Sequence, residues 1–598
     1  MHERLPPKVQ WLRAYFTTSQ AVAHDVDARG QYDPLRLFAH RNNNMAHPSL
    51  TRLERIKDRF GAPLAARKLA ALKQLERARL RTAREVERLH EAVCFVRAYP
   101  DDRRVLAAAR RLLATFATRA DLRRERAALA HTGIAGTTSW FPFFFPTAAW
   151  LAARWPQQLR FDRDDTKAGE NLAQALPLLV TAVEAEALRE AKPAGYAAID
   201  RVRARAETDA TFLVRRVLAL PGDANTREAF YDAINPSCEL LPAANTPSRT
   251  RAEYGRAPLV FQTADLRRAR PDLRASCAQP PRGFEVLSAR EGRKIVDLAR
   301  GAMVTRKRDL DAFAYGDERD VFMIDDGGGL SFAFNGLLPE RRPPIAALFG
   351  GLTLQNGVPL GYIQADCVGS SVALSFNTFE TFRGGESAHT FGRLLAVLHH
   401  VLGATSFSIE PYQLGADNEE GIASGAWWFY FKLGFRPRDR ATLQLAGAEL
   451  ARMRRHAGHR SSRATLARLA QHHLFFTLDP RAVAFLPPLT QIGWRCAQLL
   501  AQLGGADRER TILTLERAAL ARTGQGSLRG FSANEKRAWS QWAPIVALLP
   551  VERWRAQERA ALVELIRAKG AVSERAYVAL FAAHARLQQD LWNIRRGS

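Results

Sequence analysis

Apolar residues change their spacing several times between residues 371 and 437, and each spacing predicts a different element. Residues 371–376 form a strand-like run and residues 405–409 alternate between apolar and polar side chains, so we expect two strands. Between them, spacings of three, four and seven predict a helix whose buried face holds Phe391, Leu394, Leu395, Leu398, Val401 and Leu402. A second helix, capped by residues 417–420 and ended by Gly434, is predicted with a stripe of Ile422, Ala426, Phe429 and Leu433.

A short loop joins the first of these strands to the first helix. Five of its residues are Arg383, Gly384, Gly385, Ser387 and Ala388. A helix that begins on glycines and a serine presents unpaired backbone N–H groups and the positive end of its dipole, which is the environment that a pyrophosphate needs. Arg383 adds a charge-assisted donor. We therefore predict that these five residues bind the phosphates of a nucleotide cofactor.

The loop and the second helix resemble two motifs of the GNAT superfamily of acyl-CoA-dependent N-acyltransferases. The family's loop has Arg or Gln, a Gly three positions later and Gly or Ala two positions after that. Arg383 and Ala388 match this pattern, and Glu386 replaces the middle Gly. The family's helix ends in a Tyr four residues before Gly-Phe, and Tyr430 holds that position here. The order of the two motifs also fits the family.

An Asn-Gly pair at positions 356–357 predicts a β-hairpin over residues 352–363, which resembles the second and third strands of a GNAT sheet. The resemblance covers roughly residues 285–440. It implies an α+β protein in which a GNAT-like mixed sheet core is flanked by N-terminal and C-terminal mainly helical regions. The expected divisions are a helical region over residues 1–240, an irregular linker over 241–284, the acyltransferase core over 285–440 and a helical region over 441–598.

The resemblance implies direct transfer of an acyl group from a thioester to an amine. The family's fourth and fifth strands splay apart, so the pantetheine arm pairs with exposed backbone, and a main-chain N–H polarises the thioester carbonyl. A carboxylate takes the proton of the amine, and the tyrosine returns one to the leaving thiolate. By position, Tyr430 is the expected acid. Glu380, placed on the fourth strand, and Glu410 are candidate bases, and Asp366 also lies in or beside a strand.

A second interpretation is a non-catalytic, basic, GNAT-like protein that binds nucleic acid or an anionic membrane surface. Glu386 brings negative charge to the phosphate loop, and Ala423 stands where the family has an Asn, so both favour it. Tyr430 is also one aromatic residue among several in an apolar helix, as a core residue would be. Glu380 and Glu410 equally fit solvated carboxylates at strand edges.

The charge of the chain affects which partners we expect. Its 87 Lys and Arg residues exceed its 61 Asp and Glu residues, for a net charge of +26. This favours anionic partners such as acyl-CoA, an acidic acyl carrier protein or nucleic acid. The basic residues are mostly arginines spread along the whole chain, which a GC-rich coding bias explains as well as a binding surface does. The expected co-substrate is acetyl-CoA or a longer acyl-CoA, and the expected acceptor bears an amine.

The five cysteines are scattered and show no Cys-x-x-Cys spacing, which predicts reduced thiols in a cytoplasmic protein; they are Cys94, Cys238, Cys277, Cys367 and Cys496. No metal is expected, since the histidine pairs at 399–400 and 472–473 have no partner at ligand spacing. The N-terminus, Met1 to Pro7, has no secretory signal pattern.

One segment is membrane-like in composition. It runs from Trp140 to Ala153, is rich in aromatic residues, contains two prolines and is shorter than the roughly 20 residues of a spanning helix. Three interpretations remain open: a buried plug between domains, an interfacial anchor that brings the protein to a membrane surface, or part of a pocket for a hydrophobic acyl chain.

Overall fold

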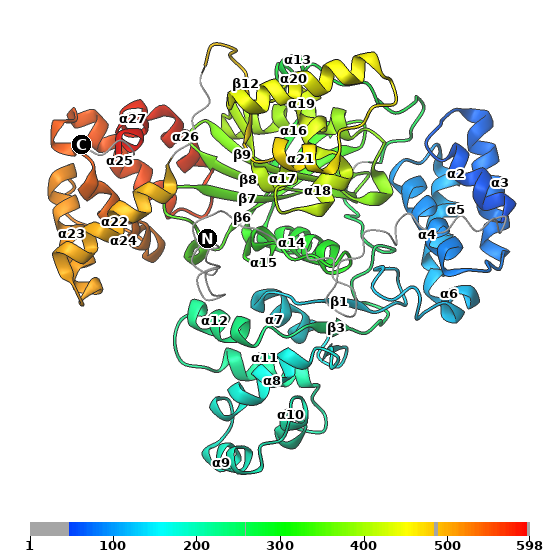
Figure 1. Cartoon of the computed structure of the whole chain (residues 1–598), viewed down its shortest axis with the longest axis horizontal. Helices are drawn as coiled ribbons and strands as arrows, with labels where there is room; N and C mark the ends of the chain where they lie inside the picture. The colour runs from blue at the N-terminus through cyan, green and yellow to red at the C-terminus, as the bar shows by residue number, and fades with distance from the viewer. Residues whose placement is uncertain (1–46, 258, 483–487, 595–598) are drawn as a thin grey trace.

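A nine-stranded sheet lies at the centre of the computed structural model, which describes residues 47–594 apart from residue 258 and residues 483–487. Helical regions from both ends of the chain surround the sheet (Figure 1). The predicted mixed α+β class with flanking helical regions is therefore confirmed.

The central sheet has the strand order β11-β12-β10-β9-β8-β7-β6-β5-β4. Its strands are β4 (Gly283–Val286), β5 (Gly316–Gly327), β6 (Leu330–Leu337), β7 (Ala347–Gln355), β8 (Val358–Val368), β9 (Ser371–Thr378), β10 (Ser406–Ile409), β11 (Arg436–Pro437) and β12 (Leu474–Thr477). Strands β4 to β9 form an antiparallel meander. Strand β10 runs parallel to β9, and β12 is antiparallel to both β10 and β11. The crossover that a parallel pair requires is the helix α16 (Ser387–Leu402).

The predicted hairpin is confirmed at the turn between β7 and β8. Asn356 and Gly357 both have positive φ, 49° and 78°, as a two-residue type I′ turn demands. The Asn356 Nδ2 also donates to the carbonyl of Ala98 at 2.9 Å. The same turn therefore sets the strand register and ties the sheet to the N-terminal helices.

The two faces of the sheet are covered differently. Alternate residues of β8, among them Ile363 and Ala365, pack in one buried cluster with Phe391 and the other apolar residues of α16. The opposite face is covered over β5, β6 and β7 by α14 (Ala289–Val304) and α15 (Asp311–Ala314). The polar residues of β8, two positions apart along the strand, therefore point to the face opposite α16.

The aromatic helix differs from the prediction of one continuous helix. It is divided into α18 (Glu419–Ser424) and α19 (Ala426–Lys432) by Gly425, which has φ 67°. The N-cap is Asn418, whose side chain accepts a hydrogen bond from the N–H of Gly421. The break rotates the second piece, so Tyr430 is buried rather than Phe429, which is only partly buried.

The first part of the chain forms two packed units rather than a single helical region. The first unit contains α2 (Pro48–Ile56), α3 (Ala62–Arg77), α4 (Ala83–Ala98), α5 (Arg103–Ala114) and α6 (Ala120–Arg124), around its own apolar cluster. The second contains a three-stranded sheet, β1 (Ser139–Phe141), β2 (Leu159–Phe161) and β3 (Cys238–Leu240), with helices α7 (Phe145–Arg154), α8 (Thr166–Ala175), α9 (Ala182–Ala191), α10 (Ala197–Val202), α11 (Asp209–Leu218) and α12 (Ala224–Ile234).

The aromatic segment that begins at Trp140 supplies much of the second core. Phe141, Phe143 and Phe145 are all buried there. Asp309, from the loop before α15, accepts hydrogen bonds from the Phe144 N–H and the Thr147 hydroxyl, both at 3.0 Å. This packing favours the plug between domains over the other two interpretations. In the part of the chain that the structure describes, no helix combines the length and the apolar character needed to cross a bilayer.

The predicted linker is largely irregular, with one short helix, α13 (Leu273–Cys277), before β4. The predicted end of the core at residue 440 is too early, because β12 belongs to the sheet and follows an insertion of α20 (Arg440–Arg455) and α21 (Arg463–Leu469). The remaining helices are α17 (Pro411–Leu414), which follows β10, and the C-terminal α22 (Leu489–Gly504), α23 (Arg508–Thr523), α24 (Ala533–Leu548), α25 (Ala556–Lys569), α26 (Arg575–Ala583) and α27 (Ala585–Asn593).

A buried ionic cluster joins these C-terminal helices to the sheet. Glu574 bonds Lys569 and lies 3.5 Å from Arg342, and the side chains of all three are at most 2% exposed. Replacing Glu574 by Ala would leave two buried cations without their carboxylate. We expect this to lower the free energy of unfolding by about 3–5 kcal/mol, measured by urea denaturation. Glu564→Ala, at an exposed position of α25, is the control; equal losses in the two variants would contradict the role of the cluster.

Candidate functional site

Strand β10 covers only the first residues of β9. Ser371, Val372 and Ala373 pair with residues 406–408 of β10, which ends at Ile409, whereas β9 continues to Thr378. The other edge of β9 is paired with β8 along its whole length. The β10-facing edge of residues 374–378 therefore presents backbone groups that β10 does not bind.

Tyr430 lies at this opening. Its hydroxyl is 3.5 Å from the carbonyl oxygen of Phe376, on the open edge of β9. Its ring packs edge-on against Phe391 of α16, with centroids 5.4 Å apart. Burial, and then the neighbouring Tyr362, raises the pKa of Tyr430 above its ordinary value. The side chain is therefore a neutral phenol, held by packing and able to donate a proton.

The predicted cofactor loop does precede a helix N-terminus. Gly384 has φ 80°, which places it in the left-handed region, and no other part of the protein approaches the position that its Cβ would occupy. Ser387 and Ala388 open the 16-residue helix α16, whose first turn has unpaired N–H groups. Gly385 is packed against the carbonyl of Phe382. The backbone geometry thus agrees with an anion-binding turn.

Arg383 is already engaged with the protein. Its Nε donates to the carbonyl of Thr378 at 3.0 Å, and its guanidinium forms an ion pair with Glu420. Glu420 also pairs with Arg308 at 2.5 Å, and Arg308 donates to the Tyr362 hydroxyl at 2.8 Å. Burial favours the neutral acid, but the two arginines outweigh it and lower the pKa of Glu420 to about 2.

The Arg308, Tyr362 and Glu420 side chains were not identified from the sequence. The sequence places Glu420 only within the cap of the second helix, and the structure puts it in the first turn of α18. Arg308 and Glu420 are separated by 112 positions, so no local pattern links them. Tyr362 was part of the predicted hairpin without a role.

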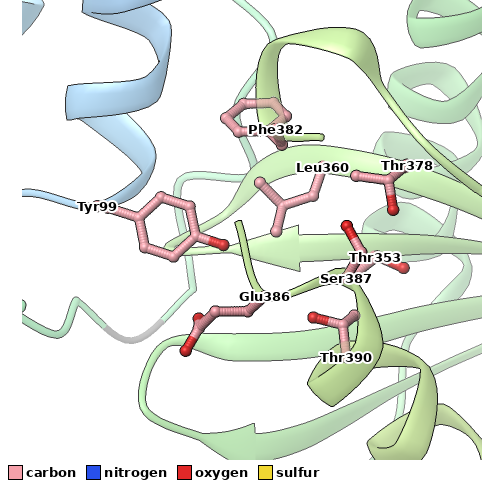
Figure 2. Close-up of a pocket in the computed structure, with 9 residues that line it drawn as sticks. Tyr99, Thr353, Leu360, Thr378, Phe382, Glu386, Ser387 and Thr390 are labelled. Carbon is pink, nitrogen blue, oxygen red and sulfur yellow. The ribbon is translucent and has the colours of Figure 1, made fainter. Parts of the chain in front are cut away.

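Glu386, the residue that departs from the family loop, is turned towards the linker. One of its carboxylate oxygens accepts a hydrogen bond from the Arg267 N–H at 2.8 Å. Beside it, Figure 2 shows a pocket where Ser387 and Thr390 of α16 meet Tyr99 from the end of α4. The pocket measures about 10 Å³, which is roughly the space for one water molecule.

A polar surface lies on the face opposite α16, beside the opening. Tyr362, Gln364 and Asp366 of β8 share this face, and the register places Asn377 of β9 opposite Tyr362. The Oδ1 of Asn377 is buried and meets no donor among the described residues. Such an orphaned acceptor is costly unless a ligand or water supplies a donor.

Asp366 is the carboxylate with the most altered acidity on this face. It lies opposite Ala373, where the pairing of β9 with β10 ends, and Gln364 Nε2 donates to it at 3.2 Å. Burial, and then the charge of Glu410, raises the pKa of Asp366 to about 8. A base with a pKa near the working pH is the most effective.

The fold separates Glu380 from the other two carboxylates named from the sequence, Glu410 and Asp366. Glu380 is not on the fourth strand, because β9 ends at Thr378 and Glu380 begins an exposed 3₁₀ turn. Burial, then Glu91 and, less strongly, Glu380 raise the pKa of Glu87 on α4, so Glu380 lies near the N-terminal helices. Glu410 directly follows β10 and acts on Asp366. Asp366, opposite Ala373 where the β9–β10 pairing ends, and Tyr430, beside the Phe376 carbonyl, are therefore the candidate base and acid.

No family model, no curated protein and no solved structure matches the chain. The candidate site therefore rests on the geometry of these residues alone.

Proposed function

We propose that this protein is a GNAT-type N-acyltransferase that moves an acyl group from acyl-CoA, or from an acylated carrier protein, to an amine. The observation that carries the proposal is the parallel β9–β10 pair, which opens after Ala373 with the Tyr430 hydroxyl at its edge. The crossover helix α16 begins at the same end of β9 with a glycine turn. This is the arrangement that the resemblance of the two motifs leads us to expect.

The edge of β9 that β10 does not cover suits a pantetheine arm, whose amides would compete with Tyr430 and Arg383 for the Phe376 and Thr378 carbonyls. Amide groups of an extended ligand pair with an unfilled strand edge as an added strand would, and main-chain hydrogen bonds supply the affinity. The diphosphate would lie at the first turn of α16, near Gly384 and Ser387. The thioester would then reach the point where the two strands meet, beside Asp366.

Asp366 and Tyr430 would carry out the two proton transfers of the reaction. The amine nitrogen attacks the thioester carbonyl carbon, so a C–N bond forms and the C–S bond breaks. Asp366 in its ionised form takes the proton that the nitrogen loses, directly or through water, and Tyr430 gives a proton to the departing thiolate. The amine N–H also matches the orphaned Oδ1 of Asn377.

Calorimetric titration with acetyl-CoA and with a long-chain acyl-CoA tests the proposal. Saturable binding at micromolar concentration is expected for at least one of them. Preference for the longer chain would point to an acyl pocket. If neither thioester binds and an acylated carrier protein does not transfer its acyl group to any amine, the proposal is wrong.

Replacing Glu386 by Gly is expected to tighten CoA binding about fivefold, because one negative charge leaves the first turn of α16. The same titration measures the dissociation constant. Glu186→Gln, which removes an exposed carboxylate of α9, is the control for net charge. An unchanged affinity in Glu386→Gly would mean that the phosphates bind elsewhere.

One observation favours the non-catalytic alternative. Arg383, the only arginine of the predicted phosphate loop, is neutralised by Glu420. In that case the basic surface would bind nucleic acid or an anionic membrane. A steep loss of nucleic-acid affinity with rising salt, with no effect of CoA, would support this function.

A further inference from the structure

A small cavity lies behind the candidate loop, where the N-terminal helices meet the central sheet. Its volume is about 10 Å³. The lining includes Cys94 and Arg97 of α4, Arg249 from the segment after β3, and Arg306 just after α14. Thr381 closes it from the 3₁₀ turn that precedes Arg383.

The arginines that line the cavity leave donors unused. Arg97 is 4% exposed and gives its Nη1 to the Thr250 carbonyl at 2.6 Å. Arg249 gives its Nη1 to the carbonyl of Thr132 at 2.9 Å. Among the described residues, neither the buried Nε of Arg97 nor that of Arg249 has a hydrogen-bond partner. Buried N–H groups of this kind normally have a partner, so two adjacent exceptions indicate a missing acceptor.

The positive charge around the cavity is also not balanced. The carboxylate beside these arginines is Glu91, which pairs with the Arg249 guanidinium and accepts a hydrogen bond from the Thr381 hydroxyl. Arg306 gives its Nη1 to the carbonyl of Ala302 at 3.0 Å, and burial, then the charge of Arg249, lowers its pKa. One carboxylate thus faces three guanidinium groups, including that of Arg97. Buried charges need partners, so a further anion would relieve the excess.

Neighbouring titratable groups do not supply that anion. The Cys94 thiol and the His90 ring are 3.6 Å apart, and a proton passing between them leaves their summed charge unchanged. Glu380 is exposed on the outer side of the turn. Glu87 is not among the residues that line the cavity, and burial, then Glu91, raises its pKa.

We propose that this cavity binds one halide ion, chloride under ordinary conditions, through the free Nε–H groups of Arg97 and Arg249 and the charge of Arg306. The volume, roughly that of one water-sized particle, is too small for a tetrahedral oxyanion, and the surrounding positive charge favours a monatomic anion. The ion would hold the turn at Thr381 and Phe382, directly before Arg383. This site is independent of the acyltransferase proposal, since its ligand is bound whether or not CoA is.

Diffraction from crystals of the full chain in sodium bromide tests the site directly. An anomalous peak inside the cavity, in contact with the two Nε atoms, is expected. No peak at high bromide concentration would overturn the proposal, and so would a tetrahedral density from phosphate in the same place.

Thermal unfolding gives the test in solution. At constant ionic strength, replacing gluconate by chloride should raise Tm along a saturable curve, because an ion that binds only the folded state stabilises it. Arg306→Gln should shift the midpoint of that curve about tenfold to higher chloride. Arg104→Gln, at an exposed position of α5, is the matched control and should leave it unchanged. Curves without a chloride effect, or with equal shifts in both variants, would contradict the site.

Discussion

Tyr430→Phe is expected to lower kcat for acyl transfer by about 10²–10⁴-fold, the range over which a positioned general acid contributes. The phenol is neutral because burial raises its pKa, and its hydroxyl stands at the open edge of β9, where the thiolate would leave. Phenylalanine keeps the ring that packs on Phe391, so the free energy of unfolding should change little. Single-turnover rates with saturating acyl-CoA measure the effect on the chemical step.

Tyr231→Phe is the matched control for that experiment. Tyr231 is also fully buried, but it lies on α12 in the second N-terminal unit, beside Cys238. Removing the Tyr231 hydroxyl in this variant should leave the rate of acyl transfer unchanged. If Tyr430→Phe turns over as fast as the parent protein, Tyr430 is a core aromatic and not the acid.

Asp366→Asn is expected to reduce kcat/KM by about 10²-fold or more, because an amide cannot take the proton of the amine. In the parent protein the pKa of Asp366 is raised to about 8 by burial and then by Glu410. Only the ionised form is a base, so the parent rate should rise with pH and level off above about 8. A rate profile without this rise, or an Asn variant with full activity, would exclude Asp366.

Glu410→Gln separates the two candidate bases. If Asp366 is the base, removing the Glu410 charge lowers the pKa of Asp366, so the rise in rate moves to lower pH and activity persists. If Glu410 is itself the base, activity is lost. The two outcomes are distinguished by the same pH profiles.

The raised pKa of Asp366 also affects stability. The folded protein holds a proton on Asp366 that the unfolded chain releases near the ordinary pKa of an aspartate, 3.8. The contribution of this proton to the free energy of unfolding is therefore complete below pH 3.8 and is lost as pH rises through about 8. In the parent protein the free energy of unfolding should therefore decline as pH rises towards 8. Asp366→Asn should remove this part of the decline, as measured by urea denaturation at several pH values.

Much of the local structure of this protein could be predicted from residue order. The Asn356-Gly357 turn, the apolar face of α16 and the run that becomes β10 depend on side chains a few positions apart. Turn geometry and helical periodicity act over that range, so the pattern alone indicated them. The prediction of a single helix across Gly425 was wrong because Gly425 adopts a left-handed φ of 67°, which ends one helix and begins the next.

The tertiary structure decided which of these pieces form a site. Tyr430 meets Phe376 across 54 positions, and Arg308 meets Glu420 across 112. Strand β12 reached the sheet only after two inserted helices, and Glu380 turned away from the opening because β9 ends before it. Residue order is enough to set the helices and strands, since these depend on near neighbours. The order of strands, the gap between β9 and β10 and the burial that raises the pKa of Asp366 depend on contacts between distant segments, which only the packed fold sets.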